Sequence, residues 1–156
     1  MQIRRAVIGD IDRIGKLLRQ VLDVHHNARP DLFHAGAKKY TEPELIEILS
    51  DDQRPIFVYE DDEHGVCGYA FCIFVQHIDN NILTDIKTLY IDDLCVDSEC
   101  RGRGIGKALY NYVVSYAKSE GCYNLTLNVW ADNTSALGFY ESLGLHKQKI
   151  GMEKIL

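Results

Sequence analysis

Apolar residues recur at helical spacing in four segments of the chain. These segments span residues 11–22, 42–49, 104–118 and 133–143. Asp10 is a suitable N-cap for the first, and Thr41-Glu42-Pro43-Glu44 opens the second as a capping box with proline in the first turn. Gly121 and Gly144 follow the last two as stop signals. The pattern predicts four helices, of which 104–118 has the clearest apolar face.

Runs rich in aromatic and β-branched residues predict the strands. They span residues 3–6, 56–60, 66–76, 88–96, 125–130, 145–148 and 151–155. The polar stretch Asp61–Gly65 is expected to be a hairpin loop, and residues 23–40 are expected to be irregular, with a turn at Arg29-Pro30-Asp31.

The resulting order is β-α-α-β-β-β-α-β-α-β-β. No linker, repeat or low-complexity segment divides the chain, so one domain over residues 1–156 is expected. Long strands alternate with helices only in the second half. The fold class is therefore predicted to be α/β, with a central mixed sheet and helices on both faces.

Composition and charge narrow the function classes. The net charge of −6 argues against nucleic acid as a partner, because phosphate binding needs a basic surface. No apolar run reaches the roughly 20 residues of a membrane helix, and the first residues do not resemble a signal peptide, so a cytoplasmic protein without a membrane partner is expected. The five cysteines include no C-x-x-C pair, which favours reduced thiols and no metal site.

The most informative residues are Arg101-Gly102-Arg103-Gly104-Ile105-Gly106-Lys107, between a predicted strand and the best predicted helix. Glycines let main-chain N–H groups approach an anion, and a helix N-terminus adds partial positive charge. This predicts a phosphate or pyrophosphate site. The Walker pattern fails at Arg101 and Ala108, and the dinucleotide pattern fails at Lys107 and Leu109.

The same segment, together with the preceding Leu94-Cys95-Val96, resembles the signature of the GNAT superfamily of N-acetyltransferases. Arg101, Gly104 and Gly106 match that signature in register. A second motif is also similar to the family's pattern, through Asn133, Ala136, Phe139, Tyr140 and Gly144. Leu145 stands where the family usually has Phe, an apolar exchange.

The resemblance implies a mostly antiparallel sheet in which two splayed strands hold acetyl-CoA. The family's turn amides bind the CoA pyrophosphate, and its preceding strand contacts the pantetheine arm and polarises the thioester carbonyl. The implied cofactor residues are Leu94, Cys95, Val96, Arg101, Gly102, Arg103, Gly104, Ile105, Gly106, Lys107, Asn133 and Ser135. Asn133 is also a helix N-cap by its position alone.

The resemblance also implies two catalytic groups. Tyr140 would protonate the leaving thiolate, although its spacing equally fits a core residue. The acceptor amine must lose a proton, and Asp92 or Asp93 is the candidate base. Adjacent strand residues point to opposite faces, so only one should reach the site, and Asp92 is favoured.

The expected activity is acetyl transfer from acetyl-CoA to a primary amine of a small molecule or peptide by direct attack on the thioester. The sequence does not identify the acceptor, and it leaves a homodimer open. His25, His26, Phe33 and Tyr40 could line the acceptor pocket or simply pack or face solvent. The alternative function is a CoA-binding sensor or interaction domain without catalysis.

Overall fold

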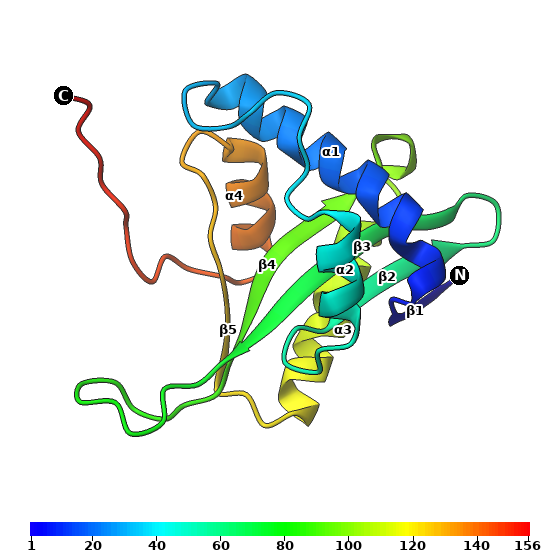
Figure 1. Cartoon of the computed structure of the whole chain (residues 1–156). Helices are drawn as coiled ribbons and strands as arrows, with labels where there is room; N and C mark the ends of the chain where they lie inside the picture. Colours follow the sequence, from blue (N-terminus) through cyan, green and yellow to red (C-terminus); the bar gives the residue numbers. More distant parts are fainter.

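In the computed structural model, which describes residues 1–156, five strands form one sheet (Figure 1). The strands lie in the order β1 (Gln2–Arg5), β2 (Ile56–Asp61), β3 (Gly65–Val75), β4 (Thr88–Val96) and β5 (Asn124–Leu127). The first four are antiparallel to their neighbours, and β5 is parallel to β4. This confirms the predicted mixed, mostly antiparallel sheet.

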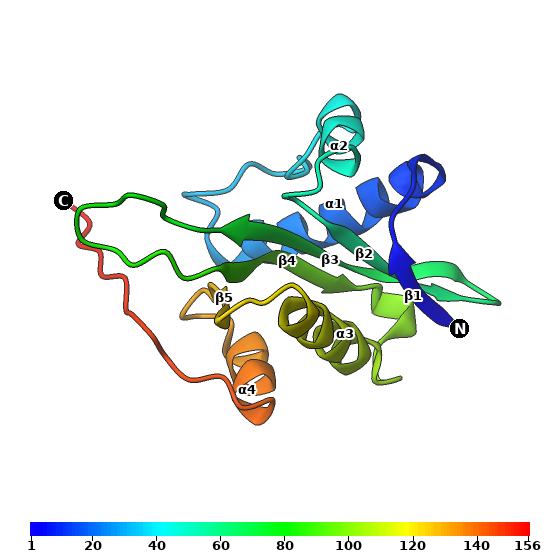
Figure 2. The same cartoon turned by 90° about the horizontal axis from the view of Figure 1, so that it is seen from below.

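Four helices cover the two faces of the sheet. They are α1 (Ile11–Ala28), α2 (Glu42–Leu49), α3 (Ile105–Ser119) and α4 (Thr134–Ser142), accompanied by the 3₁₀ turns η1 (Ile8–Asp10) and η2 (Ser98–Cys100). Helices α1 and α2 lie on one face, and α3 and α4 on the other (Figure 2). No helix of the structure combines the length and the apolar character that crossing a membrane requires.

Strand β3 is buried on both faces, which explains its nearly continuous apolar sequence. Tyr69 and Phe71 pack with the buried residues of α1 and α2. Ala70 and Cys72 pack on the opposite face with the buried residues of α3. The core is therefore two apolar layers separated by the central strands.

Helix α3 crosses the sheet very close to β3 at Gly68. A Cβ atom at Gly68 would lie 2.7 Å from the carbonyl oxygen of Cys95 in β4 and 3.1 Å from Cδ1 of Leu109 in α3. No side chain fits there without moving main chain. This close approach fixes where the start of α3 lies relative to β4.

Three element boundaries differ from the predictions. Helix α1 continues to Ala28, through residues predicted to be irregular, and β5 ends at Leu127 instead of residue 130. The predicted closing strands, 145–148 and 151–155, are absent, and residues 146–156 are exposed without regular structure. Strands need a hydrogen-bonded neighbour, and this segment has none within its own chain.

We expect Gly68→Ala to destabilise the fold by about 1–3 kcal/mol, because the added methyl group meets main chain that cannot move freely. Gly138→Ala in α4 is the matched control. Its Cβ would meet nothing within 4 Å, and alanine favours a helix interior, so it should be neutral or slightly stabilising. Urea unfolding of both variants measures the difference, and equal stabilities would contradict the close approach.

Candidate active site

Strand β4 loses one of its neighbours halfway along its length. Strand β5 pairs with β4 only over residues 88–91, whereas β3 accompanies β4 up to Val96. Beyond Leu127, the chain leaves the sheet toward α4. Residues 92–96 of β4 therefore form an open edge inside the fold, which is the splayed strand pair that the sequence predicted.

The ladder between β3 and β4 decides which main-chain groups face this open edge. The Asp97 amide donates to the Cys67 carbonyl oxygen at 2.8 Å. Because hydrogen-bonded and non-hydrogen-bonded pairs alternate in an antiparallel ladder, the main-chain groups of Cys95 face β3. Those of Leu94 and Val96 face the opening. The edge can therefore pair with an additional extended chain at Leu94 and Val96.

The glycine-rich turn closes one end of the open edge. Gly102 and Gly104 both have a φ of 76°, in the left-handed region that favours glycine. Helix α3 then begins at Ile105 with neither an acidic residue in its first turn nor a side-chain cap. The first main-chain bond to a helix residue here is that from the Ala108 amide to Gly104. The amides of residues 105–107 are thus free to bind an anion.

The three cations of the turn have different surroundings. Arg103 donates to Oδ2 of Asp61 at 2.7 Å, which ties the turn to the β2–β3 hairpin. Hydrogen bonds from His64, the Glu63 amide and Arg103 hold the pKa of Asp61 well below its usual range. Arg101 and Lys107 are exposed and form no ion pair, so they supply the positive field that the sequence assigned to all three residues.

Helix α4 lies beside the same opening. Asn133 caps it, because its side chain accepts from the Ala136 amide at 3.1 Å. Ser135 is exposed in the first turn. Phe139 packs on the start of α3, since a Cβ at Gly106 would lie 3.5 Å from its ring. The second motif is thereby held against the first.

Tyr140 is half-buried against the core layer of α3, and its hydroxyl makes no hydrogen bond within the protein. Burial, followed by the negative charge of Asp93 and then the neighbouring Tyr110, raises the pKa of Tyr140 to about 12. The phenol is therefore protonated at neutral pH. Its ring packs in the apolar layer on the α3 side of the sheet.

A β-bulge changes the directions of the two candidate carboxylates. Phe71 is opposite Asp93, whereas Cys72 is opposite Ile91, so Asp92 is an extra residue without a partner in β3. The expectation that adjacent aspartates point to opposite faces is therefore wrong here. Both carboxylates contact residues of the α1–α2 side of the sheet.

The Asp93 carboxylate lies beside Tyr69, whose hydroxyl donates to Oδ2 at 2.9 Å. Burial raises the pKa of Asp93 to about 6, which the hydrogen bond from Tyr69 and the charge of Lys39 only partly offset. Asp93 is thus ionised at neutral pH but is a stronger base than an ordinary aspartate.

Asp92 is engaged by two side chains from the segment before α2. Lys39 Nζ lies 2.8 Å from Oδ1, and the Tyr40 hydroxyl donates to Oδ2 at 2.6 Å. Burial and this hydrogen bond raise the pKa of Tyr40. Tyr40 also stacks on Phe71 with ring centroids 5.4 Å apart. Tyr40 thus links the core to the site.

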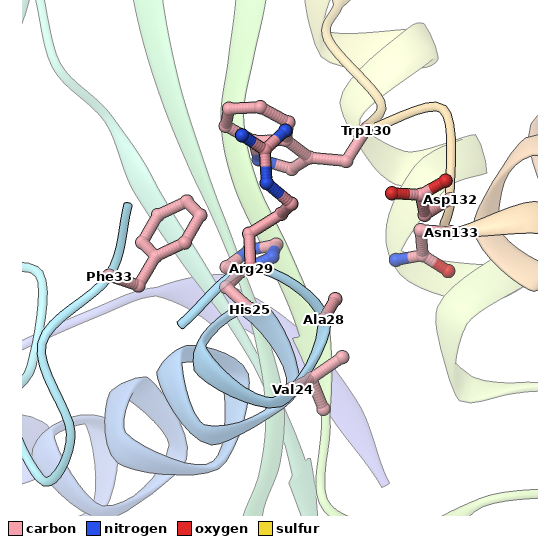
Figure 3. A pocket seen from close by; sticks show the side chains of 8 residues that line it. All are labelled: Val24, His25, Ala28, Arg29, Phe33, Trp130, Asp132 and Asn133. Atoms are coloured by element: carbon pink, nitrogen blue, oxygen red, sulfur yellow. The ribbon is translucent and has the colours of Figure 1, made fainter. Parts of the chain in front are cut away.

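A cavity of about 130 Å³ lies between the end of α1, the following loop and the segment before α4 (Figure 3). The His25 ring stacks on Phe33, which in turn meets the edge of Trp130. The pKa of His25 is lowered by burial and then by Lys39, the residue that contacts Asp92. The lining residues are Val24, His25, Ala28, Arg29, Phe33, Trp130, Asp132 and Asn133.

All five cysteines are free thiols in the structure. Cys67 and Cys100 are buried under the glycine-rich turn, with their Sγ atoms 2.9 Å apart, and they pack with Ile105 and Leu109. Burial raises the pKa of Cys67 to about 12. These thiols are part of the apolar support of the turn, as the sequence predicted for reduced core cysteines.

Comparison with known proteins agrees with this geometry. A family model described as "Acetyltransferase (GNAT) family" matches residues 20–145. The chain belongs to this family. Among GNAT relatives, the thialysine N-epsilon-acetyltransferase of Bos taurus is 36% identical, covering 92% of this chain and 83% of that protein. An uncharacterized N-acetyltransferase of Methanocaldococcus jannaschii is 29% identical over 77% of this chain.

The chain spans 51% of the length of the archaeal GNAT relative, and 44% and 40% of two other curated relatives. A solved structure, the tetramutant of the BH1408 protein from Bacillus halodurans, is 31% identical, covers 100% of both chains and has a TM-score of 0.95. An aminoglycoside N-acetyltransferase solved in complex with CoA shares the fold, with a TM-score of 0.71 and 17% identity over 99% of this chain and 98% of that one.

The structure brings most of the residues predicted from sequence to one opening of this GNAT fold. The turn, Leu94 and Val96 border it, whereas the main chain of Cys95 pairs with β3. Asn133, Ser135 and Tyr140 belong to the cap and body of α4, which packs on the start of α3 through Phe139. Tyr69 and Lys39 were not predicted. No sequence pattern indicated these two residues, because each contacts an aspartate that lies far away in the sequence.

The raised pKa of Asp93 gives a prediction for stability. In the unfolded chain an aspartate titrates near pH 4, and in the folded protein Asp93 titrates near pH 6. Stability contributed by this group therefore falls as the pH rises from about 4 to 6, and it stays lower above pH 6. We expect Asp93→Asn to raise the free energy of unfolding at pH 8 by on the order of 1–3 kcal/mol, and to change it little at pH 4.

Asp92→Asn is the matched control, because it removes the ion pair with Lys39 and should not stabilise the protein at pH 8. Urea unfolding at the two pH values measures both variants. An Asp93→Asn effect of equal size at pH 4 and pH 8 would show that the carboxyl group is not held in an environment that disfavours its charge.

Proposed function

We propose that the protein is an acetyl-CoA-dependent N-acetyltransferase that acts on a small primary amine. The observation that carries the proposal is the open edge of β4, which lies beside the free amides at the start of α3, because Gly106 packs against Val96. An extended thiol-bearing arm and a pyrophosphate need these two features in this order. Family membership supports the same activity.

In this proposal the amides of residues 102–107 bind the pyrophosphate, with Arg101 and Lys107 adding positive charge. The pantetheine arm pairs with the main chain at Leu94 and Val96. Cys95 supports this segment from the core, where it is buried. Asn133 and Ser135 approach the arm from the other side, at the start of α4.

The reaction requires one proton to leave the amine and one to reach the sulfur. The amine nitrogen attacks the carbonyl carbon of the thioester, the C–N bond forms and the C–S bond breaks. A main-chain N–H group of the β4 edge stabilises the negative charge on the carbonyl oxygen. The products are the amide and the free thiol of CoA.

For the base we propose Asp93, in place of the Asp92 favoured by the sequence. Asp93 has a carboxylate of raised pKa, whereas Asp92 is ion-paired with Lys39. Asp93 takes the amine proton, directly or through water. Tyr140, protonated at neutral pH, donates to the departing sulfur.

The acceptor is proposed to be a cationic amine on a flexible chain. Lys39 already places an ammonium group against Asp92, 2.8 Å from its carboxylate, so this region stabilises alkylammonium ions. The aromatic rings of Phe33 and Trp130 can hold the apolar part of such a chain. One curated relative is named for an N-epsilon-acetyltransferase of thialysine, whose name fits the same chemical class.

The cofactor site is tested by Gly104→Asp. A carboxylate at the start of α3 would repel the pyrophosphate, so acetyl-CoA should bind at least about 10²-fold more weakly and no longer raise the melting temperature. Gly121→Asp is the matched control, since Gly121 has a φ of 72° against 76° for Gly104 but lies beyond the other end of α3. Calorimetric titration measures the affinity of both variants for acetyl-CoA, and an unchanged affinity of Gly104→Asp would refute the assignment.

The catalytic base is tested by the pH dependence of kcat/KM, with a panel of diamines and amino acids. We expect a rise through an apparent pKa near 6, the pKa of Asp93. Asp93→Asn should lose this rise and lower kcat/KM by roughly 10²-fold. Asp92→Asn should keep it. The opposite ranking would make Asp92 the base, and acetyl-CoA binding without thiol release from any amine would favour the non-catalytic alternative.

A further inference from the structure

Three side chains that can bind a metal ion meet beneath the glycine-rich turn. A ring nitrogen of His64 and the Sγ atoms of Cys67 and Cys100 all lie within 4.8 Å of one another. His64 lies in the β2–β3 hairpin and Cys67 near the start of β3, whereas Cys100 lies in η2, directly before Arg101. The hairpin and η2 are at the same end of the sheet in both views (Figures 1 and 2). The fold thus gathers one nitrogen and two sulfur ligands, the donor types that Zn²⁺ prefers.

The hairpin holds His64 in place through Asp61. Oδ1 of Asp61 accepts from the amides of Glu63 at 3.0 Å and His64 at 3.2 Å, and it lies 3.0 Å from Nδ1 of the His64 ring. Gly65 follows with a φ of 67°, in the left-handed region that favours glycine, and turns the chain into β3. A carboxylate that orients the ring is the usual outer partner of a metal-binding histidine. His64 is therefore positioned as a ligand by the fold of the hairpin itself.

The two cysteines are fully buried, and each sulfur has only the other as a hydrogen-bonding partner, at 2.9 Å. The His64 side chain is 41% exposed, so a cation can reach the sulfur atoms from the solvent side of the hairpin. Two sulfur atoms bound to one Zn²⁺ at about 2.3 Å stand about 3.8 Å apart. Binding therefore requires the side chains of Cys67 and Cys100 to rotate slightly apart.

The charges in this region favour a divalent cation. Asp61 is already neutralised by Arg103, whose guanidinium group donates to Oδ2 at 2.7 Å. Two thiolates would balance the two positive charges of the metal, so the occupied site would carry no net charge beside the apolar Ile105 and Leu109. A disulfide is the alternative for two adjacent thiols. Buried thiols are inert toward oxidants, whereas a metal ion takes the place of the thiol protons as it binds.

We propose that His64, Cys67 and Cys100 bind one Zn²⁺ ion, with a water molecule in the fourth position. The ion ties Cys100, and with it the start of the glycine-rich turn, to the β2–β3 hairpin. It thereby adds to the contact that Arg103 already makes with Asp61. The expectation of no metal site rested on the absence of a C-x-x-C pair, but here the second cysteine lies 33 residues from the first, and only the fold brings the two together.

The first test uses Co²⁺ as a probe, because it replaces Zn²⁺ and its absorption reports the ligands. The full chain is reduced, freed of metal with a chelator and titrated with Co²⁺ without oxygen or acetyl-CoA. We expect uptake of one Co²⁺ per chain, with a strong sulfur-to-metal charge-transfer band that Zn²⁺ then abolishes. Uptake without this band would place the ion on the carboxylates of Asp61 and Glu63 with His64, and would overturn the proposal. No uptake by the reduced protein would also overturn it.

The second test changes the one exposed ligand, so that the core is left intact. His64→Ala should weaken Co²⁺ binding at least about 10²-fold. His77→Ala is the matched control, because His77 is exposed in the loop between β3 and β4 and should leave the affinity unchanged. Zn²⁺ should raise the melting temperature of the native chain and of His77→Ala, but not that of His64→Ala. Equal Co²⁺ affinities of His64→Ala and the native chain would contradict the site, whether or not the protein transfers acetyl groups.

Discussion

The site depends on one missing set of hydrogen bonds, those that β5 would make to β4 beyond Ile91. A main-chain N–H or C=O group that is removed from water without a partner costs about 1–3 kcal/mol, so an open edge inside a fold is stable only where solvent or a ligand can reach it. The departure of β5 toward α4 creates this opening. Because Gly106 at the start of α3 packs against Val96 at the end of β4, the free amides of the turn lie beside the open edge, and one extended ligand can meet both.

The β-bulge at Asp92 is the second feature on which the geometry of the site depends. Strict alternation counted back from Cys95, which packs on the α1–α2 side, would place Asp93 on that side and Asp92 on the α3 side. With the bulge, both carboxylates lie on the side of α1 and α2, where they contact different residues. Lys39 neutralises one, while burial raises the pKa of the other. Two adjacent aspartates thereby acquire different properties from a single extra residue in one strand.

Whether a feature could be predicted from the sequence depends on how far apart in the sequence its interacting residues lie. The apolar face of α3, the cap of α4 by Asn133 and the glycine-rich turn are local, so their residues indicated them correctly. The bulge is not local, because it exists only relative to the partner strand at Phe71 and Cys72. The contact of Arg103 with Asp61 joins residues 42 positions apart, and no local pattern reveals it.

The absent closing strands are a different kind of failure, because the apolar pattern of residues 145–155 predicts strands but the segment has no hydrogen-bonded neighbour in the structure. Ordering the main chain costs about 1–2 kcal/mol per residue, whereas an exposed ion pair such as that of Arg29 and Glu153 contributes at most about 1 kcal/mol. A suitable pattern is therefore not sufficient to form a strand, because the strand also needs a sheet edge that it can reach. Arg29 also lines the cavity between α1 and α4. The residue that pairs with Glu153 therefore borders the proposed acceptor region, so the course of the C-terminal segment and the shape of that region depend on one side chain.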